Sequence, residues 1–186
     1  MTDIPLDPVW VETTGDRDRT TSLRDLGKTD FFTRELDQLL LHRYIDAAIH
    51  SAKDLPDPLP AGLQLAALTS CINPHDSLVL RPGETLHPRF VIATSSTRRE
   101  ELVRSLCPDV QFIDLRGTIE ERLTKLSDYS ADGVVIAEAA LIRLGLTHLN
   151  RVLLPGETTP LQGRLAIVVR REDARTAQLF AAIHAP

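Results

Sequence analysis

The sequence predicts an α/β protein of two domains in which strands and helices alternate. Short apolar runs rich in valine, isoleucine and alanine recur along the chain and end in turn residues, as buried strands do. Three strand–helix units follow one another after residue 90. The composition changes at a turn over residues 81–84, and we place the domain boundary there. Domain 1 then comprises residues 1–84 and 164–186, and domain 2 comprises residues 85–163.

The composition excludes several classes of protein. The 186 residues carry a formal net charge of −5 and two cysteines, Cys71 and Cys107, without the spacing of a metal site. An acidic chain does not suit a general nucleic-acid or anionic-membrane surface. No apolar run is long enough to span a membrane, and the first residues lack the pattern of a secretory signal. We therefore expect a cytoplasmic monomer without a metal ion and without nucleic-acid or membrane partners.

Domain 1 is expected to contain a long helix and several strands. Phe32, Leu36 and Leu40 recur at helical spacing, so we predict a helix from a cap at Thr29 or Asp30 to about residue 43. The apolar run 44–49 that follows indicates a buried parallel strand. Further strands are predicted at residues 10–14, 63–68, 76–80 and 165–170, and a last helix at residues 175–184.

The residues directly after the strand 44–49 are ionisable. Lys53 and Asp54 stand just past its carboxyl end, and in open α/β sheets this is where ligands bind. Pro56, Pro58 and Pro60 remove backbone donors, so the chain beyond Asp54 is expected to run as an extended loop. The alternative, from residue types alone, is a surface loop in which both charges are solvated.

Domain 2 begins with a strand at residues 90–93 that ends in Thr94, Ser95 and Ser96, at the start of a helix reaching about residue 107. Backbone N–H groups and hydroxyls at a helix N-terminus form a site for an anion, and the adjacent Arg98 and Arg99 suit carboxylates. The alternative is that Ser95 or Ser96 serves only as the N-cap of this helix.

Two further strand–helix units follow. A strand at residues 110–115 leads into a helix opened by a capping box at Thr118, and a strand at residues 133–137 leads into a helix closed by Gly145. Arg116 follows the first of these strands, and Arg122 lies early in its helix. Parallel strands bring their carboxyl ends to one edge of the sheet, so we expect one cleft to be faced by residues 94–96, Arg98, Arg99 and Arg116. Clustered arginine in an acidic chain indicates a site for a small polyanion.

Four segments resemble, in order and spacing, the motifs of the porphobilinogen deaminase (hydroxymethylbilane synthase) family: residues 50–56, 93–99, 114–122 and 137–145. The resemblance covers essentially the whole chain from about Glu12 onward. It implies two domains like those of type II periplasmic binding proteins with a cleft between them, and a third domain that is absent here. It also implies an enzyme of haem biosynthesis that joins four porphobilinogens head to tail with loss of ammonia.

By this resemblance Asp54 is the catalytic acid, which assists departure of the substrate's amino group and then, ionised, stabilises the cationic azafulvene. The implied cofactor is dipyrromethane, and the implied partners are porphobilinogen and linear pyrrole chains. The positions that match the family's cofactor- and substrate-binding residues are Ser51, Lys53, Thr94, Ser95, Ser96, Arg98, Arg99, Arg116, Gly117, Arg122, Ala137 and Arg143.

The chain departs from the family pattern in several respects. The family's N-terminal strand has no counterpart before Trp10, and Lys28 lacks the glycines that flank it in the family. The sequence ends at Pro186, where the third domain with the cofactor-attaching cysteine would begin, and neither Cys71 nor Cys107 matches that cysteine.

Three functions are therefore weighed. The first is a compact deaminase that holds the cofactor without a covalent bond or through an unexpected cysteine. The second is a non-catalytic module that binds pyrrole carboxylates, or an inactive truncated homologue. The third is a regulatory or interaction protein that uses only the fold. Asp54 favours the enzyme, because a carboxylate in the cleft would weaken the binding of other carboxylates.

Overall fold

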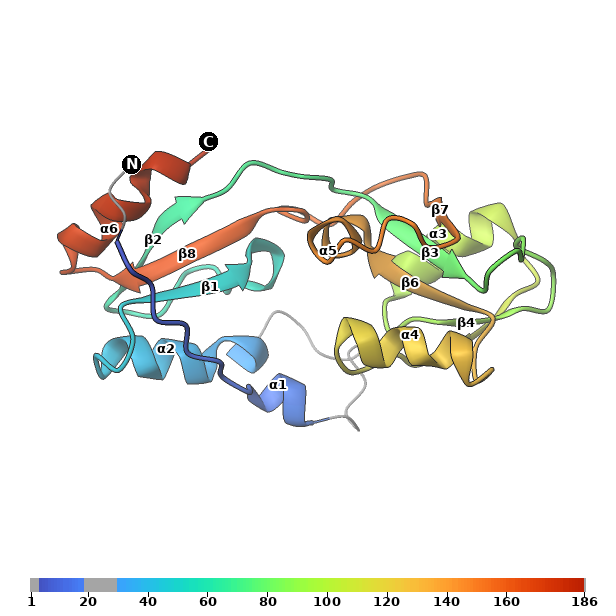
Figure 1. The fold of residues 1–186 in the computed structure, drawn as a ribbon, viewed down its shortest axis with the longest axis horizontal. Coiled ribbons are helices and arrows are strands. Elements are labelled where there is room, and N and C mark those ends of the chain that lie inside the picture. Colours follow the sequence, from blue (N-terminus) through green and yellow to red (C-terminus); the bar gives the residue numbers. More distant parts are fainter. Residues whose placement is uncertain (1–3, 19–29, 186) are drawn as a thin grey trace.

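The computed structural model describes residues 4–18 and 30–185. It has two lobes, each built on one β-sheet, and two extended chain segments connect them (Figure 1). The predicted cap at Thr29 and the departure at Lys28 lie outside the described residues. None of the helices in the described ranges is long and apolar enough to cross a membrane.

The first lobe contains a three-stranded sheet in the order β1-β8-β2, formed by β1 (Ala47–Ser51), β8 (Leu165–Arg170) and β2 (Leu63–Leu68). The prediction of a parallel strand at residues 44–49 is wrong, because β1 begins at Ala47 and pairs with β8 in the antiparallel sense. The reason is topological: β8 returns from the other lobe and inserts between β1 and β2, so both neighbours run against it.

Helices cover both faces of this sheet. α2 (Arg34–Leu41) follows the short 3₁₀ turn η1 (Asp30–Phe32) and packs Leu40 against Ala48, Leu63 and Val168. α6 (Ala174–Phe180), continued by η3 (Ala181–Ile183), covers the opposite face.

The strand predicted at residues 10–14 does not form. The chain is irregular up to Thr13, which caps the short helix α1 (Thr14–Arg17). The Asp16 carboxylate accepts a hydrogen bond from the Thr13 N–H at 2.8 Å, and the Asp16 N–H donates to the Thr13 hydroxyl at 3.2 Å. This local bonding satisfies the Thr13 N–H, which a strand would have offered to a neighbour.

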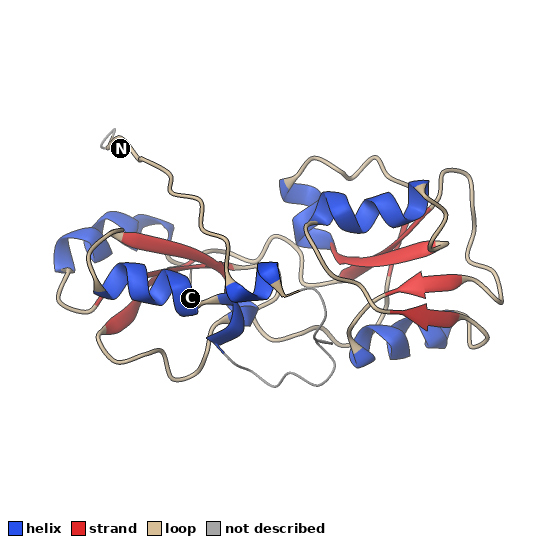
Figure 2. Ribbon diagram, turned by 90° about the horizontal axis from the view of Figure 1, so that it is seen from below, coloured by secondary structure: helices blue, strands red, loops and turns tan. Residues whose placement is uncertain are grey.

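The second lobe contains a five-stranded sheet in the order β5-β4-β6-β3-β7. Three of its strands are parallel, as predicted, whereas β3 runs antiparallel to both its neighbours. Helices cover both faces (Figure 2), α3 on one side and α4 and α5 on the other. The elements are β3 (Asp76–Leu80), β4 (Val91–Ala93), α3 (Thr97–Leu106), β5 (Gln111–Ile113), α4 (Ile119–Ser127), β6 (Gly133–Ala137), α5 (Glu138–Arg143) and β7 (Arg151–Leu153).

The position of β3 corrects the predicted domain boundary at residue 84. Leu78 is paired with Val135 on one side and Val152 on the other, so β3 belongs to the second lobe. The turn after β3 is not a linker, because the Asn150 side-chain amide donates to the carbonyls of Arg81 (2.7 Å) and Glu84 (2.8 Å) and fixes the turn to this lobe. The chain therefore crosses between the lobes before β3, at residues 69–75, and again at residues 154–164 (Figure 1).

Candidate functional site

The end of β1 holds Asp54 at the side of the first lobe that faces the second. A 3₁₀ turn, η2 (Ala52–Asp54), continues directly from the strand. Ala52 is buried, its N–H donates to the Arg164 carbonyl at 3.1 Å, and Leu55 packs against the first-lobe core. The backbone around Asp54 is thus anchored on both sides, while the aspartate side chain itself is exposed to solvent.

The surroundings of Asp54 raise its pKa. The largest cause is loss of hydration between the walls of the two lobes, which disfavours the ionised carboxylate even though the side chain keeps an open path to solvent. The charges of Lys53, Arg99 and Arg122 oppose this shift only in part. Two of these three cations belong to the second lobe, so Asp54 lies within electrostatic reach of residues from both sides of an interlobe cleft.

Lys53 connects the two lobes through Gln162. Its ammonium donates to the Gln162 side-chain carbonyl at 3.2 Å, and Gln162 lies on the second crossing segment. Burial, followed by the charge of Arg99, lowers the pKa of Lys53, while Asp54 and Asp76 partly oppose the shift. Sequence reasoning did not identify Gln162 as a site residue.

Asp76, the first residue of β3, is the partner of the predicted arginine pair. Its side chain is fully buried, and it accepts hydrogen bonds from Arg99 Nε (3.0 Å), Arg99 Nη2 (2.6 Å) and an Arg98 guanidinium nitrogen. Burial alone would raise the pKa of Asp76, but these two arginines outweigh it and hold the pKa below its usual range. Arg98 also donates to the Glu157 carbonyl at 2.7 Å. Asp76 was missed because its only sequence signal is a carboxylate at the start of an apolar strand.

The hydroxyl residues after β4 have local structural partners. Ser96 is the N-cap of α3 and accepts from the Arg99 N–H at 3.5 Å, in agreement with the capping alternative. Ser95 bridges to the neighbouring strand, since its hydroxyl accepts from the Leu115 N–H (2.7 Å) and donates to the Leu115 carbonyl (3.0 Å). Thr94 is buried at the end of β4. An anion at this helix terminus stays a prediction.

Arg116 reaches from the second lobe to α1 of the first. Its Nη2 donates to the carbonyls of Gly15, at 3.0 Å, and Asp18, and its guanidinium lies 5.8 Å from the centre of the Phe31 ring. Gly117 follows with a φ of +95°, which permits the turn into the capping box of α4.

Arg122, one turn into α4, donates from Nε to the Gly117 carbonyl at 2.8 Å. Its pKa is lowered to about 10, first by burial and then by the positive charges of Arg99 and Arg116, with Asp54 opposing. The mutual repulsion of these cations means that an added anion would be stabilised among them.

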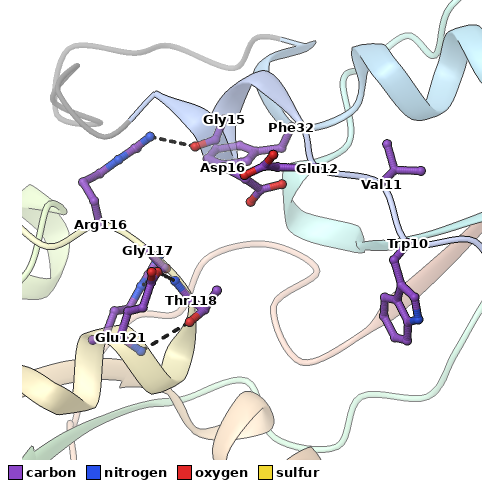
Figure 3. Close-up of a pocket in the computed structure, with 11 residues that line it drawn as sticks. Trp10, Val11, Glu12, Gly15, Asp16, Phe32, Arg116, Gly117, Thr118 and Glu121 are labelled. Atoms are coloured by element: carbon purple, nitrogen blue, oxygen red, sulfur yellow. Dashed lines mark hydrogen bonds between the residues drawn. The ribbon is translucent and has the colours of Figure 1, made fainter.

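A cavity of about 480 Å³ opens between α1 and the start of α4 (Figure 3). Trp10 and Phe32 contribute aromatic surface to it, and Arg116, Thr118 and Arg122 contribute polar atoms. The cavity adjoins the arginines of the cleft and is large enough for a small organic ligand.

The remaining predicted site residues are spread around the crossing segments. Ser51 is exposed at the end of β1, and Ala137 is the N-cap residue of α5 at the end of β6. Arg143 donates to the Gly163 carbonyl at 2.8 Å and so contacts the second crossing segment. The structure thus brings Lys53, Asp54, Arg99 and Arg122 within electrostatic reach of one another, whereas Arg143 has a backbone partner at the crossing.

Comparison with known protein families gives one extended match. Residues 2–178 match the family described as "Porphobilinogen deaminase, dipyromethane cofactor binding domain". A porphobilinogen deaminase of Desulforudis audaxviator is 40% identical over 183 residues, which are 95% of this chain and 59% of that protein. A probable porphobilinogen deaminase of Chlamydia pneumoniae is 40% identical over 178 residues, 93% of this chain and 74% of that protein. The chain spans less than two thirds of the length of several such relatives.

Solved structures support the predicted periplasmic-binding-protein fold. An ancestral cationic amino acid solute-binding protein aligns with a TM-score of 0.53 at 11% identity, over 81% of this chain and 68% of that one. A periplasmic binding protein from Brucella ovis, solved with glutathione bound, aligns with a TM-score of 0.51 at 17% identity, over 80% and 50% of the two chains. At such low identity these similarities concern the fold alone, and they confirm the predicted two-lobed architecture of type II periplasmic binding proteins.

Proposed function

This chain belongs to the porphobilinogen deaminase family, and on that premise we propose that it joins porphobilinogen molecules head to tail with release of ammonia, the hydroxymethylbilane synthase reaction of tetrapyrrole biosynthesis. The observation that carries the proposal is the environment of Asp54. This carboxyl group has a raised pKa, is open to solvent and lies within electrostatic reach of Lys53, Arg99 and Arg122.

The environment of Asp54 suits both halves of the proposed reaction. A raised pKa keeps a larger fraction of the carboxyl group protonated, so that it can donate a proton to the departing amine. The resulting carboxylate then faces the cationic azafulvene derived from the substrate and stabilises it, more strongly in a partly dehydrated cleft than in water. The charges of Lys53, Arg99 and Arg122 lower the pKa and so favour the ionised form that this second half requires.

The cationic side chains fit carboxylated pyrroles. Arg116 Nη1 has little solvent contact and no hydrogen-bond partner within residues 4–18 and 30–185, and Arg122 is repelled by neighbouring arginines. An acetate or propionate group would accept a hydrogen bond from Arg116 Nη1, and its negative charge would offset the repulsion between Arg122 and the neighbouring arginines. We propose that Lys53, Arg116 and Arg122 hold such groups of the substrate and of the dipyrromethane cofactor, which when bound supplies the pyrrole carbon to which the first substrate unit is joined.

The two cysteines are not proposed as attachment sites for the cofactor. Cys107 is 7% exposed and packs in the core of the second lobe. Cys71 is exposed, and its thiol donates to the Gln162 carbonyl at 3.4 Å on the crossing segments. Their positions suit a small hydrophobic residue and a loop residue, respectively. Cytoplasmic location, a monomeric state and the lack of other partners stay predictions from the composition.

The alternative function is a module that binds pyrrole carboxylates without turnover. The cation-rich cleft would suit this function as well. The variant Asp54→Asn distinguishes the two. It keeps the size of the side chain but removes both the proton donor and the negative charge, so porphobilinogen consumption and ammonia release should fall by at least ~10²-fold. Binding should change little or improve, because a negative charge has left an anion-binding cleft.

The exposed Asp57 on the following loop provides the matched control, and Asp57→Asn should keep full turnover. Wild-type protein that binds porphobilinogen but never consumes it would decide for the binding module. Full turnover in Asp54→Asn would show that the catalytic acid has been wrongly assigned.

A further inference from the structure

The two crossing segments touch at Gln162, a residue that is only 3% exposed. The Ile72 N–H donates to the Gly163 carbonyl at 3.2 Å, so the two segments bond backbone to backbone. Gly163 has a φ of +85°, and a Cβ there would collide with the Asn73 carbonyl. This close approach fixes the backbone from which the Gln162 side chain projects.

The orientation of the Gln162 amide follows from its neighbours. One end lies 2.7 Å from the Pro74 carbonyl and 3.1 Å from Asp76 Oδ1. A carbonyl and an ionised carboxylate only accept hydrogen bonds, so this end must be the NH₂ group. The opposite end is then the carbonyl oxygen, and it is this atom that accepts from the Lys53 ammonium at 3.2 Å.

We propose that Gln162 is a positioning residue. It holds Lys53 beside Asp54, it holds the Asp76 carboxylate against Arg98 and Arg99, and it thereby couples the two lobes across the site. Its amide spans from the first-lobe Lys53 to the second-lobe Asp76, which already binds Arg98 and Arg99. The chemistry assigned to the site rests on the proposed function, whereas the geometry of this contact does not.

The charge state of Lys53 reports on this contact. The charged groups that act on its ammonium are Arg99 and Arg122, which disfavour the proton, and Asp54 and Asp76, which favour it. The Gln162 oxygen adds a neutral acceptor that stabilises the protonated form. Removal of that acceptor should increase the neutral, nucleophilic fraction of Lys53, and replacement by a carboxylate should decrease it.

The experiment is acylation of Lys53 by acetic anhydride, followed by peptide mass spectrometry at several pH values. In Gln162→Met the rate for Lys53 should rise by about tenfold or more, the effect of losing one hydrogen bond to a charged group. In Gln162→Glu the rate should fall below that of the wild type, because the new carboxylate favours the ammonium. Opposite changes in two variants at one position are not expected from a purely structural role.

Gln64→Met is the matched control, since Gln64 donates to the carbonyls of Arg170 and Arg171 on the first lobe, away from the site. It should leave Lys53 labelling unchanged, and far-UV circular dichroism should show all variants folded. Equal rates in the wild type and both Gln162 variants, or a shift of the same sign in both, would overturn the positioning role. Porphobilinogen turnover is measured separately: its absence from the wild type would refute the proposed function, while opposite labelling shifts would still support the role of Gln162.

Discussion

Replacing Asp76 by asparagine should lower the stability of the protein and strengthen its binding of anions. The Asp76 side chain is fully buried and binds Arg98 and Arg99, whose side chains are 27% and 12% exposed. Removing one partner of a buried ion pair costs about 3–5 kcal/mol. Because Arg98 can recover part of its hydration, we expect the lower end, a loss of about 3 kcal/mol in the free energy of unfolding.

The same change releases two guanidinium groups in the cleft. One new charge-assisted contact to a substrate carboxylate would increase the affinity for porphobilinogen by about tenfold. Urea unfolding followed by circular dichroism measures the first effect, and titration calorimetry at neutral pH measures the second. Asp132→Asn is the control: Asp132 binds Arg81 and the Val91 N–H (2.8 Å) elsewhere in the second lobe, so it should lose stability without a gain in affinity.

The pH dependence of the stability difference between the wild type and Asp76→Asn supplies a further check. The pKa of Asp76 is lowered in the folded protein, so its stabilising contribution is complete above the unfolded pKa of about 3.9 and is lost as the pH falls through the folded value. The stability difference between wild type and Asp76→Asn should therefore be constant from about pH 5 to 7 and shrink below about pH 4. A stability equal to that of the wild type at pH 7 would refute the buried ion pair.

Two further predictions concern single residues. Arg122→Leu should weaken porphobilinogen binding by about 1.5–3 kcal/mol in calorimetry, with Arg104→Leu on the exposed face of α3 as the control; loss of folding before any loss of binding would instead make Arg122 structural. His50 is 6% exposed, and burial lowers its pKa from 6.5 to about 4. Between pH 7 and pH 4 this histidine is therefore readily protonated only in the unfolded chain, so the free energy of unfolding should fall by up to about 3 kcal/mol over that range. His50→Leu should flatten this part of the stability curve, whereas the exposed His148→Leu should not.

The elements that sequence reasoning predicted well are those determined by local signals. The capping box at Thr118 forms as expected, with the Glu121 carboxylate accepting from the Thr118 N–H at 2.8 Å. The strands at residues 63–68, 76–80, 133–137 and 165–170 have the predicted bounds, because each is an uninterrupted run of mainly apolar residues between turn residues.

The errors arose where long-range pairing decides the outcome. Nothing near β1 specifies that its partner comes from residues 165–169, more than a hundred positions later. The turn after β3 has the composition of a linker, and only the Asn150 side chain, from a distant loop, marks it as part of the second lobe. Short strands such as β7 (Arg151–Leu153) are too brief to show a period.

The candidate site shows the same division. Asp54 and the arginines could be selected because their residue types and positions after strands suggest chemistry. Their partners could not, since the contacts from Asp76 to Gln162 and from Lys53 to Gln162 join residues 86 and 109 positions apart. A buried glutamine and a strand-initial aspartate have no distinctive local pattern.

These partners change which cations the cleft offers to a ligand. Sequence reasoning treated the predicted arginines as equivalent, but Arg98 and Arg99 already share the Asp76 carboxylate within the protein, and its single charge offsets part of theirs. Lys53 and Arg122, whose pKa values are lowered by burial and by neighbouring cations, are the groups that gain most from a bound carboxylate. A ligand with two carboxylates could contact both, and it would then bridge the lobes from the same side as Asp54. Gln162 holds Lys53, one of these two groups, so loss of Gln162 should weaken the binding of such a ligand as well.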